Sequence, residues 1–292
     1  MISRIILIML LALGLQAKVN VVASTTDLAD IAQQVGGENV SVISISRGSQ
    51  DPHYVEVLPS YMIKVKRADM YLMVGMELDQ WAEQVIDGSR NRKLRIVDCS
   101  KDIKRLNVPT RKVDASMGDI HPNGNPHYWL NPENGKIIAM TIARNLKSVD
   151  PQHGDAYEAN LQIFLNSIDD LEQRWATQYS MLQGQSIIYY HDTWPYFNEY
   201  FGLSAVAFVE PKPGIMPTPT HLDHLIHIIK DQNIKALAME PYFSVSAPAF
   251  LQEKTGVEIV HMAQSVGAEE NTETYQKMLE YDLAILKKVL VP

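Results

Sequence analysis

The stretch DPQHGDAYEANLQIFLNSIDDLEQRWATQYSMLQG, residues 150–184, carries the longest helical pattern in the chain. Its apolar residues recur three or four positions apart, which is typical of one face of an α-helix: Tyr157, Leu161, Phe164, Leu165, Ile168, Leu171, Trp175 and Leu182. A continuous helix from Pro151 to Leu182 would rise about 48 Å. One small domain does not need a helix of that length, so we expect a stiff spine that crosses both halves of the molecule.

Short β-branched runs alternate with amphipathic stretches on both sides of this spine. Before it, we expect strands over residues 19–24, 40–45, 70–74 and 94–97, with helices between them. After it, we expect strands over residues 186–190, 205–209, 236–239 and 257–260. This alternating order favours parallel sheets covered by helices. The predicted fold is therefore α/β, with an N-terminal lobe over 18–149, the long helix over 150–182 and a C-terminal lobe over 183–292.

The composition indicates a globular protein and excludes some partners. The chain has 292 residues, 46% of them hydrophobic and 21% charged, which is enough for two domains with buried cores. The net charge is -8 and the sequence contains no run rich in Lys and Arg. Nucleic acids and anionic membrane surfaces are therefore not expected as partners. We expect a monomer.

The first 17 residues are typical of a signal peptide. Arg4 supplies a positive charge, residues 5–15 are apolar, and Ala17 offers a small residue for cleavage. The apolar run is too short to span a bilayer, which takes roughly 20 residues. Cys99 is the only cysteine and lies far from this segment, so the sequence predicts no lipid anchor. The mature protein is expected to be free in the periplasm.

Three histidines occupy positions where a ligand could bind. His53 follows the second expected strand, His127 lies just past the polar loop 107–125, and His191 directly follows the strand 186–190. Open α/β sheets bind ligands beyond the carboxyl ends of their strands, so a cleft between two lobes could collect these imidazoles. Three neutral nitrogens with an open fourth position suit Zn²⁺. Copper, nickel and iron also accept imidazole, whereas manganese prefers more oxygen ligands.

Five motifs, in order along the mature chain, resemble the metal-binding proteins of zinc and manganese ABC importers. The first motif is Asp51-Pro52-His53 with Pro59 downstream, and the second is NPHYWLNP over residues 125–132. The others are Tyr190-His191-Asp192 ahead of FNEYFG over 197–202, then Glu240-Pro241, then Thr255-Gly256. The resemblance implies two α/β lobes joined by one long helix. It also implies that the protein captures a metal ion and delivers it to a membrane permease.

The resemblance maps three metal ligands onto His53, His127 and His191. Manganese-binding members usually carry a carboxylate at the third of these positions, so His191 favours Zn(II) as the bound metal. The fourth ligand of the family is commonly Asp or Glu ahead of a Ser-hydrophobic pair, whereas this chain has Gln264 there. An amide is a poor zinc ligand. The fourth position is therefore expected to hold water or His121, with the Gln264 amide as the weaker candidate.

Other expectations concern the surroundings of the ligands. Asp192, Glu240 and Tyr128 are candidates to hydrogen-bond the imidazoles and fix their tautomers. The loop 107–125 lacks the histidine-rich character that zinc-type relatives often have, so a simple flexible lid is expected there.

Three alternative functions remain open at this point. A zinc hydrolase could use three histidines and a zinc-bound water. Against it, the sequence has no His-Glu-x-x-His motif, and Asp192 is the only nearby candidate for a general base. The protein could also carry manganese or iron in place of zinc, or act as an extracellular metal-dependent adhesin.

Overall fold

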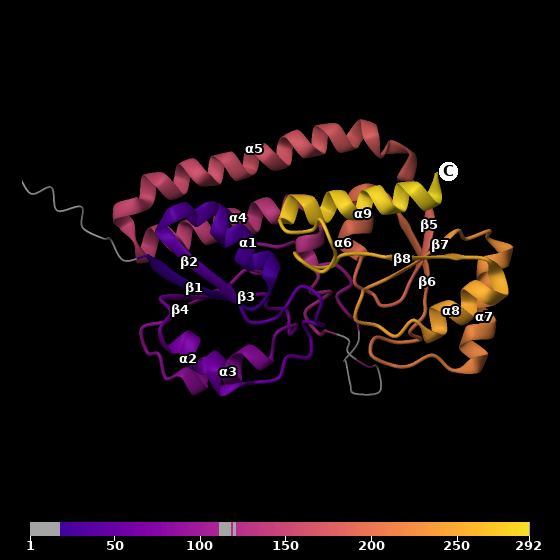
Figure 1. Cartoon of the computed structure of the whole chain (residues 1–292), viewed down its shortest axis with the longest axis horizontal. Helices are drawn as coiled ribbons and strands as arrows, with labels where there is room; N and C mark the ends of the chain where they lie inside the picture. The colour runs from indigo at the N-terminus through magenta and orange to yellow at the C-terminus, as the bar shows by residue number, and fades with distance from the viewer. Residues whose placement is uncertain (1–17, 111–117, 119–120, 292) are drawn as a thin grey trace, which may run out of the picture.

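Two parallel four-stranded sheets form the frame of the molecule (Figure 1). The computed structural model describes residues 18–110, 118 and 121–291. The expected signal peptide and most of the central part of the expected lid therefore lie outside the described residues. The first sheet has the order β2 (Val40–Ser44), β1 (Val19–Ala23), β3 (Met70–Met73) and β4 (Arg95–Asp98). The second has the order β6 (Ser204–Phe208), β5 (Ser186–Tyr189), β7 (Ala236–Met239) and β8 (Glu258–His261).

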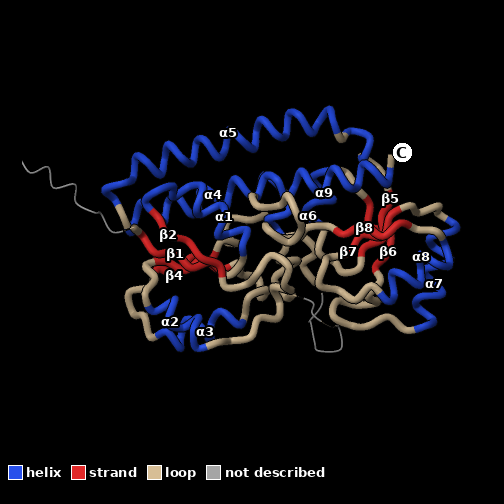
Figure 2. Tube along the Cα trace, in the orientation of Figure 1, coloured by secondary structure: helices blue, strands red, loops and turns tan. Residues whose placement is uncertain are grey.

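Both sheets are covered by helices on two faces, and the predicted α/β class is confirmed. In the first lobe, α1 (Thr26–Gly36) lies on one face, with α2 (Pro59–Lys66) and α3 (Trp81–Ser89) on the other (Figures 1 and 2). In the second lobe, α7 (Pro219–Asp231) and α8 (Ser246–Thr255) lie on one side. The final helix α9 (Tyr275–Leu290) contacts β7 and β8.

The expected spine is present, but it is shorter than the sequence pattern predicts. Helix α5 covers Gly154–Gln178, 25 residues and about 37 Å, and runs above both lobes (Figure 1). The residues before and after it form separate 3₁₀ turns, Pro151–His153 and Ser180–Leu182. At the start, the Asp150 carboxylate accepts hydrogen bonds from Tyr157 Oη and His153 Nδ1, at 2.5 and 2.6 Å. These two bonds favour a tight turn over a continued α-helix.

Two further helices lie beside this spine. Helix α4 (Pro132–Val149) packs against α5, and Figure 1 shows α4 and α9 following one another beneath it. The two lobes are therefore joined by a layer of helices.

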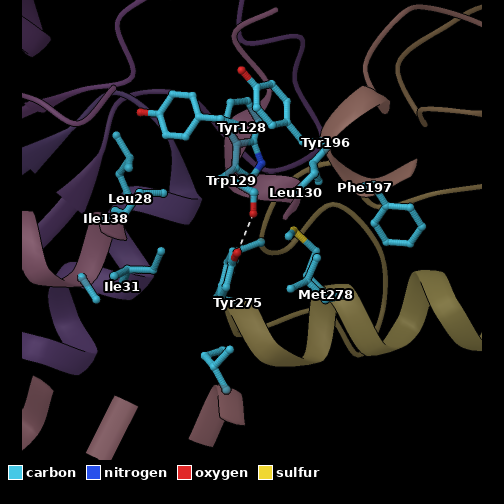
Figure 3. Packing of buried hydrophobic residues seen from close by; sticks show 14 of the residues in the cluster. Leu28, Ile31, Tyr128, Trp129, Leu130, Ile138, Tyr196, Phe197, Tyr275 and Met278 are labelled. Atoms are coloured by element: carbon cyan, nitrogen blue, oxygen red, sulfur yellow. Dashed lines mark hydrogen bonds between the residues drawn. The ribbon is translucent and has the colours of Figure 1, made fainter. Parts of the chain in front are cut away.

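One buried apolar cluster runs through both lobes. It includes Val21 of the first sheet, Ile187 of the second, and the 3₁₀ turn Tyr128–Leu130 between them. Figure 3 shows Trp129 at its centre, where Tyr275 Oη donates a hydrogen bond to the Trp129 carbonyl at 2.5 Å. The cluster is continuous from one sheet to the other and therefore does not mark where one lobe ends and the next begins. The predicted boundaries after residues 149 and 182 remain a prediction. Relative rotation of the lobes would have to disrupt this packing.

Among the described residues, every helix is too short or too polar to span a lipid bilayer.

Candidate metal centre

The structure brings the three predicted histidines together where the lobes meet. His53 lies in the turn between β2 and α2, His127 precedes the turn Tyr128–Leu130, and His191 comes two residues after β5. Each offers one ring nitrogen, and these atoms all lie within 4.8 Å of one another. The ring centroids are 5.2 Å apart for His53 and His127, 5.6 Å for His53 and His191, and 5.9 Å for His127 and His191. Three imidazoles can thus face one point.

Two of the histidines are each oriented by the residue two positions before them in the chain. Asp51 Oδ1 accepts hydrogen bonds from the backbone N–H and the Nδ1 of His53, at 2.9 and 2.8 Å. Asn125 Oδ1 accepts the same pair from His127, at 3.0 and 3.1 Å. A proline stands between the two residues in each motif and has no N–H to compete for the oxygen. Both rings therefore carry a proton on Nδ1 and direct Nε2 away from the residue that orients them.

His191 reaches the same tautomer through a distant partner. Its Nδ1 donates to Glu210 Oε2 at 2.7 Å, 19 residues along the chain. The same oxygen accepts a hydrogen bond from the backbone N–H of Gly214 at 3.0 Å. In its neutral form, each of the three histidines therefore presents an Nε2 lone pair, and this is the form that binds a cation.

The Nε2 atom of His127 is buried without a hydrogen-bond partner among the described residues. His127 is 1% exposed, and its Nε2 has no hydrogen-bond partner in the described part of the chain. A buried polar atom without a partner costs about 1–3 kcal/mol, so such an atom calls for an explanation. A metal ion at the point faced by the three rings would provide one.

Burial and repulsion between neighbouring imidazolium charges favour the neutral forms of His121 and His127. Burial, together with the neighbouring histidines, holds the pKa of His127 well below its usual value and lowers the pKa of His121 to about 3. Burial alone would also lower the pKa of His191. The hydrogen bond to Glu210 and the nearby carboxylates, including Glu240, outweigh burial and raise that pKa.

The two expected fourth ligands differ in their surroundings. His121 lies against the cluster, with its Nε2 3.2 Å from His53 Nε2. The Gln264 carbonyl accepts a hydrogen bond from Trp129 Nε1 at 2.8 Å. The Gln264 side chain is fully buried, and neither atom of its amide has a hydrogen-bond partner among residues 18–110, 118 and 121–291.

The expected partners of the imidazoles are bonded elsewhere. Tyr128 Oη donates to the Val74 carbonyl at 2.8 Å, because the tyrosine packs into the first lobe. Glu240 Oε1 accepts from Trp194 Nε1 at 2.9 Å. Asp192 Oδ2 accepts from Asn107 Nδ2 at 3.3 Å.

The residues that orient the rings are instead Asp51, Asn125 and Glu210. The first two share a visible signal, an Asx residue two positions before the histidine. No sequence signal marks Glu210, because the fold alone brings its loop to His191.

A chamber of about 50 Å³ lies at the histidines and suits a small ligand. A single water needs roughly 10–15 Å³ by this kind of measure, so the space fits an ion with a few waters. Its walls include the imidazoles of three of the four clustered histidines and are otherwise polar except for one proline: Asn107, His121, Asn125, His127, His191, Asp192 and Pro213.

Known proteins resemble this chain along nearly its whole length. The profile of the family described as "Zinc-uptake complex component A periplasmic" (ZnuA) matches residues 21–289. A metal ABC transporter substrate-binding lipoprotein of Lactococcus lactis is 25% identical over 94% of this chain and 88% of its own length. The manganese-binding lipoprotein MntA of Halalkalibacterium halodurans is also 25% identical, over 90% and 85%. A crystal structure of ZnuA superposes with a TM-score of 0.81 at 23% identity, covering 93% of this chain and 99% of that one.

Proposed function

The chain belongs to the ZnuA family of periplasmic metal-binding components of ABC importers, and we propose that the metal it carries is Zn(II). The protein captures the ion between its lobes and delivers it to the membrane permease. His53, His127 and His191 supply three ligands through Nε2. Water or His121 completes the tetrahedral set that zinc prefers.

The ligand chemistry is the observation that supports zinc. Within the described ranges, the group of side chains that converge at 4.8 Å contains three histidines and no carboxylate. Imidazole nitrogen suits zinc, whereas manganese prefers oxygen ligands. Some relatives are named for manganese and others for zinc, so the family alone does not decide the metal.

Metal analysis of protein purified from the periplasm tests the proposal. We expect one tightly held zinc per chain, and near-complete loss of it in His53→Ala, His127→Ala and His191→Ala. His224→Ala on the exposed side of α7 is the matched control and should keep its zinc. A protein that prefers manganese in direct competition, or that keeps its zinc in the three variants, would contradict the proposal.

Release of the ion is proposed to involve local loop movement. The apolar cluster shared by both lobes and the helix layer above them oppose a large hinge motion. Solution scattering should therefore give nearly the same radius of gyration with and without zinc, while hydrogen exchange changes in the loops around His53, His121 and His127. A large change in the radius of gyration would count against this mechanism.

Two finer points complete the proposal. The protein binds its ion without catalysis, so zinc-loaded protein should not hydrolyse esters or peptides. Turnover that disappears in His191→Ala would favour the hydrolase.

The two relatives quoted above are named lipoproteins, whereas this sequence predicts no lipid anchor. The intact mass of the periplasmic protein distinguishes the two states.

A further inference from the structure

Glu210 differs from the other two residues that orient the rings, because it also holds a separate segment of chain. One oxygen, Oε2, accepts hydrogen bonds from His191 Nδ1 at 2.7 Å and from the Gly214 N–H at 3.0 Å. Asp51 and Asn125 instead bond the backbone N–H of the same histidine that they orient. Only at His191 does the orienting oxygen connect the ring to another turn.

That turn, residues 211–217, lies on the surface although Glu210 is buried. The Ile215 N–H donates to the Lys212 carbonyl at 2.9 Å, and Gly214 has φ +75°, a conformation that glycine adopts readily. Ile215 is 43% exposed and Met216 is 77% exposed, whereas Glu210 is 8% exposed. The carboxylate therefore links a buried imidazole to an exposed, partly apolar turn.

We infer that Glu210 is a positioning residue that couples metal binding at His191 to the conformation of the 211–217 turn. The inference rests on the proposed function, because it requires His191 to hold the metal. A cation on Nε2 withdraws charge from the ring and makes Nδ1–H a stronger hydrogen-bond donor to the carboxylate. The carboxylate is then held in place and keeps its second bond, to Gly214.

The coupling acts in both directions. If the metal orders the turn, then a partner that draws the turn away from Glu210 must weaken metal binding by the same factor. Loss of a residue that hydrogen-bonds a metal-bound histidine typically lowers metal affinity about 10- to 100-fold. A permease that engages Ile215 and Met216 could thus loosen the ion without moving the lobes.

Hydrogen exchange at the amides of Gly214, Ile215 and Met216, combined with calorimetric zinc titration, tests this coupling. In the unmodified protein, zinc should slow exchange at Gly214 by about tenfold or more. In Glu210→Ala, zinc affinity should fall about 10- to 100-fold, and zinc at saturating concentration should no longer slow exchange in the turn.

Asp51→Ala is the matched control. It removes the partner of His53 and should lower zinc affinity comparably, but the Asp51 carboxylate bonds His53 and not Gly214, so zinc must still slow exchange at Gly214. Glu210→Gln keeps an acceptor oxygen and the fold, and should retain the zinc-dependent protection that Glu210→Ala loses. A Gln variant that binds zinc without this protection would overturn the inference.

The same measurements separate the two proposals. Unmodified protein that fails to bind zinc would overturn the proposed function. Unmodified protein that binds zinc while exchange at Gly214 stays unchanged, or Glu210→Ala that keeps the full protection, would overturn the coupling alone.

Discussion

The hydroxyl of Tyr275, at the start of the last helix, lies 2.5 Å from the carbonyl of Trp129, two residues after His127 (Figure 3). It also donates to the Asn131 carbonyl at 3.2 Å. The C-terminal helix thereby supports the segment that carries one proposed ligand. The bond to the Trp129 carbonyl is buried, so it matters for stability.

Tyr275→Phe should lower the free energy of unfolding by about 1–3 kcal/mol, because the buried Trp129 carbonyl loses its partner. Urea unfolding of the metal-free protein measures this loss. Tyr281→Phe removes a longer, exposed bond of 3.4 Å to the His261 carbonyl and serves as the control. Equal effects of the two substitutions would argue against a special role for Tyr275.

Lys136 of α4 should stabilise the helix layer. Its ammonium lies 2.5 Å from Asp169 and 2.7 Å from Glu172, both on α5, and 3.0 Å from Glu133. The Lys136 side chain is only 13% exposed, so water screens these charges incompletely.

Lys136→Met should therefore destabilise the protein by about 1–3 kcal/mol, since it leaves three carboxylates facing one another. Added salt should reduce the loss. Lys277→Met, which breaks an exposed pair with Glu273, should cost under about 1 kcal/mol. Thermal unfolding at two salt concentrations checks both values, and a salt-independent loss would contradict the electrostatic explanation.

Asp27 should make stability depend on pH. Burial raises its pKa to about 7, although Oδ1 accepts a hydrogen bond from the Val266 N–H at 2.9 Å. The unfolded chain loses this proton near 3.8, the ordinary value, whereas the folded protein keeps it up to about 7. Folding therefore takes up a proton between these values, and the contribution of Asp27 to stability falls as pH rises through that range.

Asp27→Asn removes this titration and keeps an oxygen for Val266. The variant should gain stability relative to the unmodified protein as pH rises from 5 to 8, measured by urea unfolding. Glu83→Gln, on the exposed side of α3, should show no such trend. A pH-independent difference between Asp27→Asn and the unmodified protein would refute the prediction.

Gln264→Asp should shift metal preference toward manganese. The substitution places a carboxylate at the position to which the family resemblance assigns a fourth ligand, and oxygen ligands favour manganese over zinc. The ratio of manganese to zinc affinity should rise at least about tenfold, measured by competition titration. Gln264→Asn, which keeps a neutral amide, is the control. An unchanged ratio would show that residue 264 does not reach the ion.

Periodicity and element order were sufficient to predict the two parallel sheets and a long helix over them. They could not predict where that helix begins. The hydrogen bonds of Asp150 with Tyr157 and His153 form a tight turn there, and the spacing of apolar residues does not reveal it. Nor could they place α9 in the layer beneath α5, since that position depends on packing between segments far apart in the chain.

The meeting of His53, His127 and His191 followed from strand ends and family motifs; their role as ligands remains a proposal. The residues that hydrogen-bond the three rings could not be predicted from strand ends or motifs. Asp192 and Glu240 bond other groups, because side-chain direction at a strand end depends on the tertiary structure. Glu210 reaches His191 only because both follow neighbouring strands, β6 and β5.

The Asp51-Pro52-His53 and Asn125-Pro126-His127 units have a consequence for protein engineering. In each, the acceptor that orients the imidazole comes from the same three residues as the ring itself. Grafted into an exposed turn of an unrelated scaffold, such a tripeptide should bring its own hydrogen-bond acceptor for the ring with it. Two grafts placed opposite one another would give a designer half of a metal-binding module before any other residue is chosen.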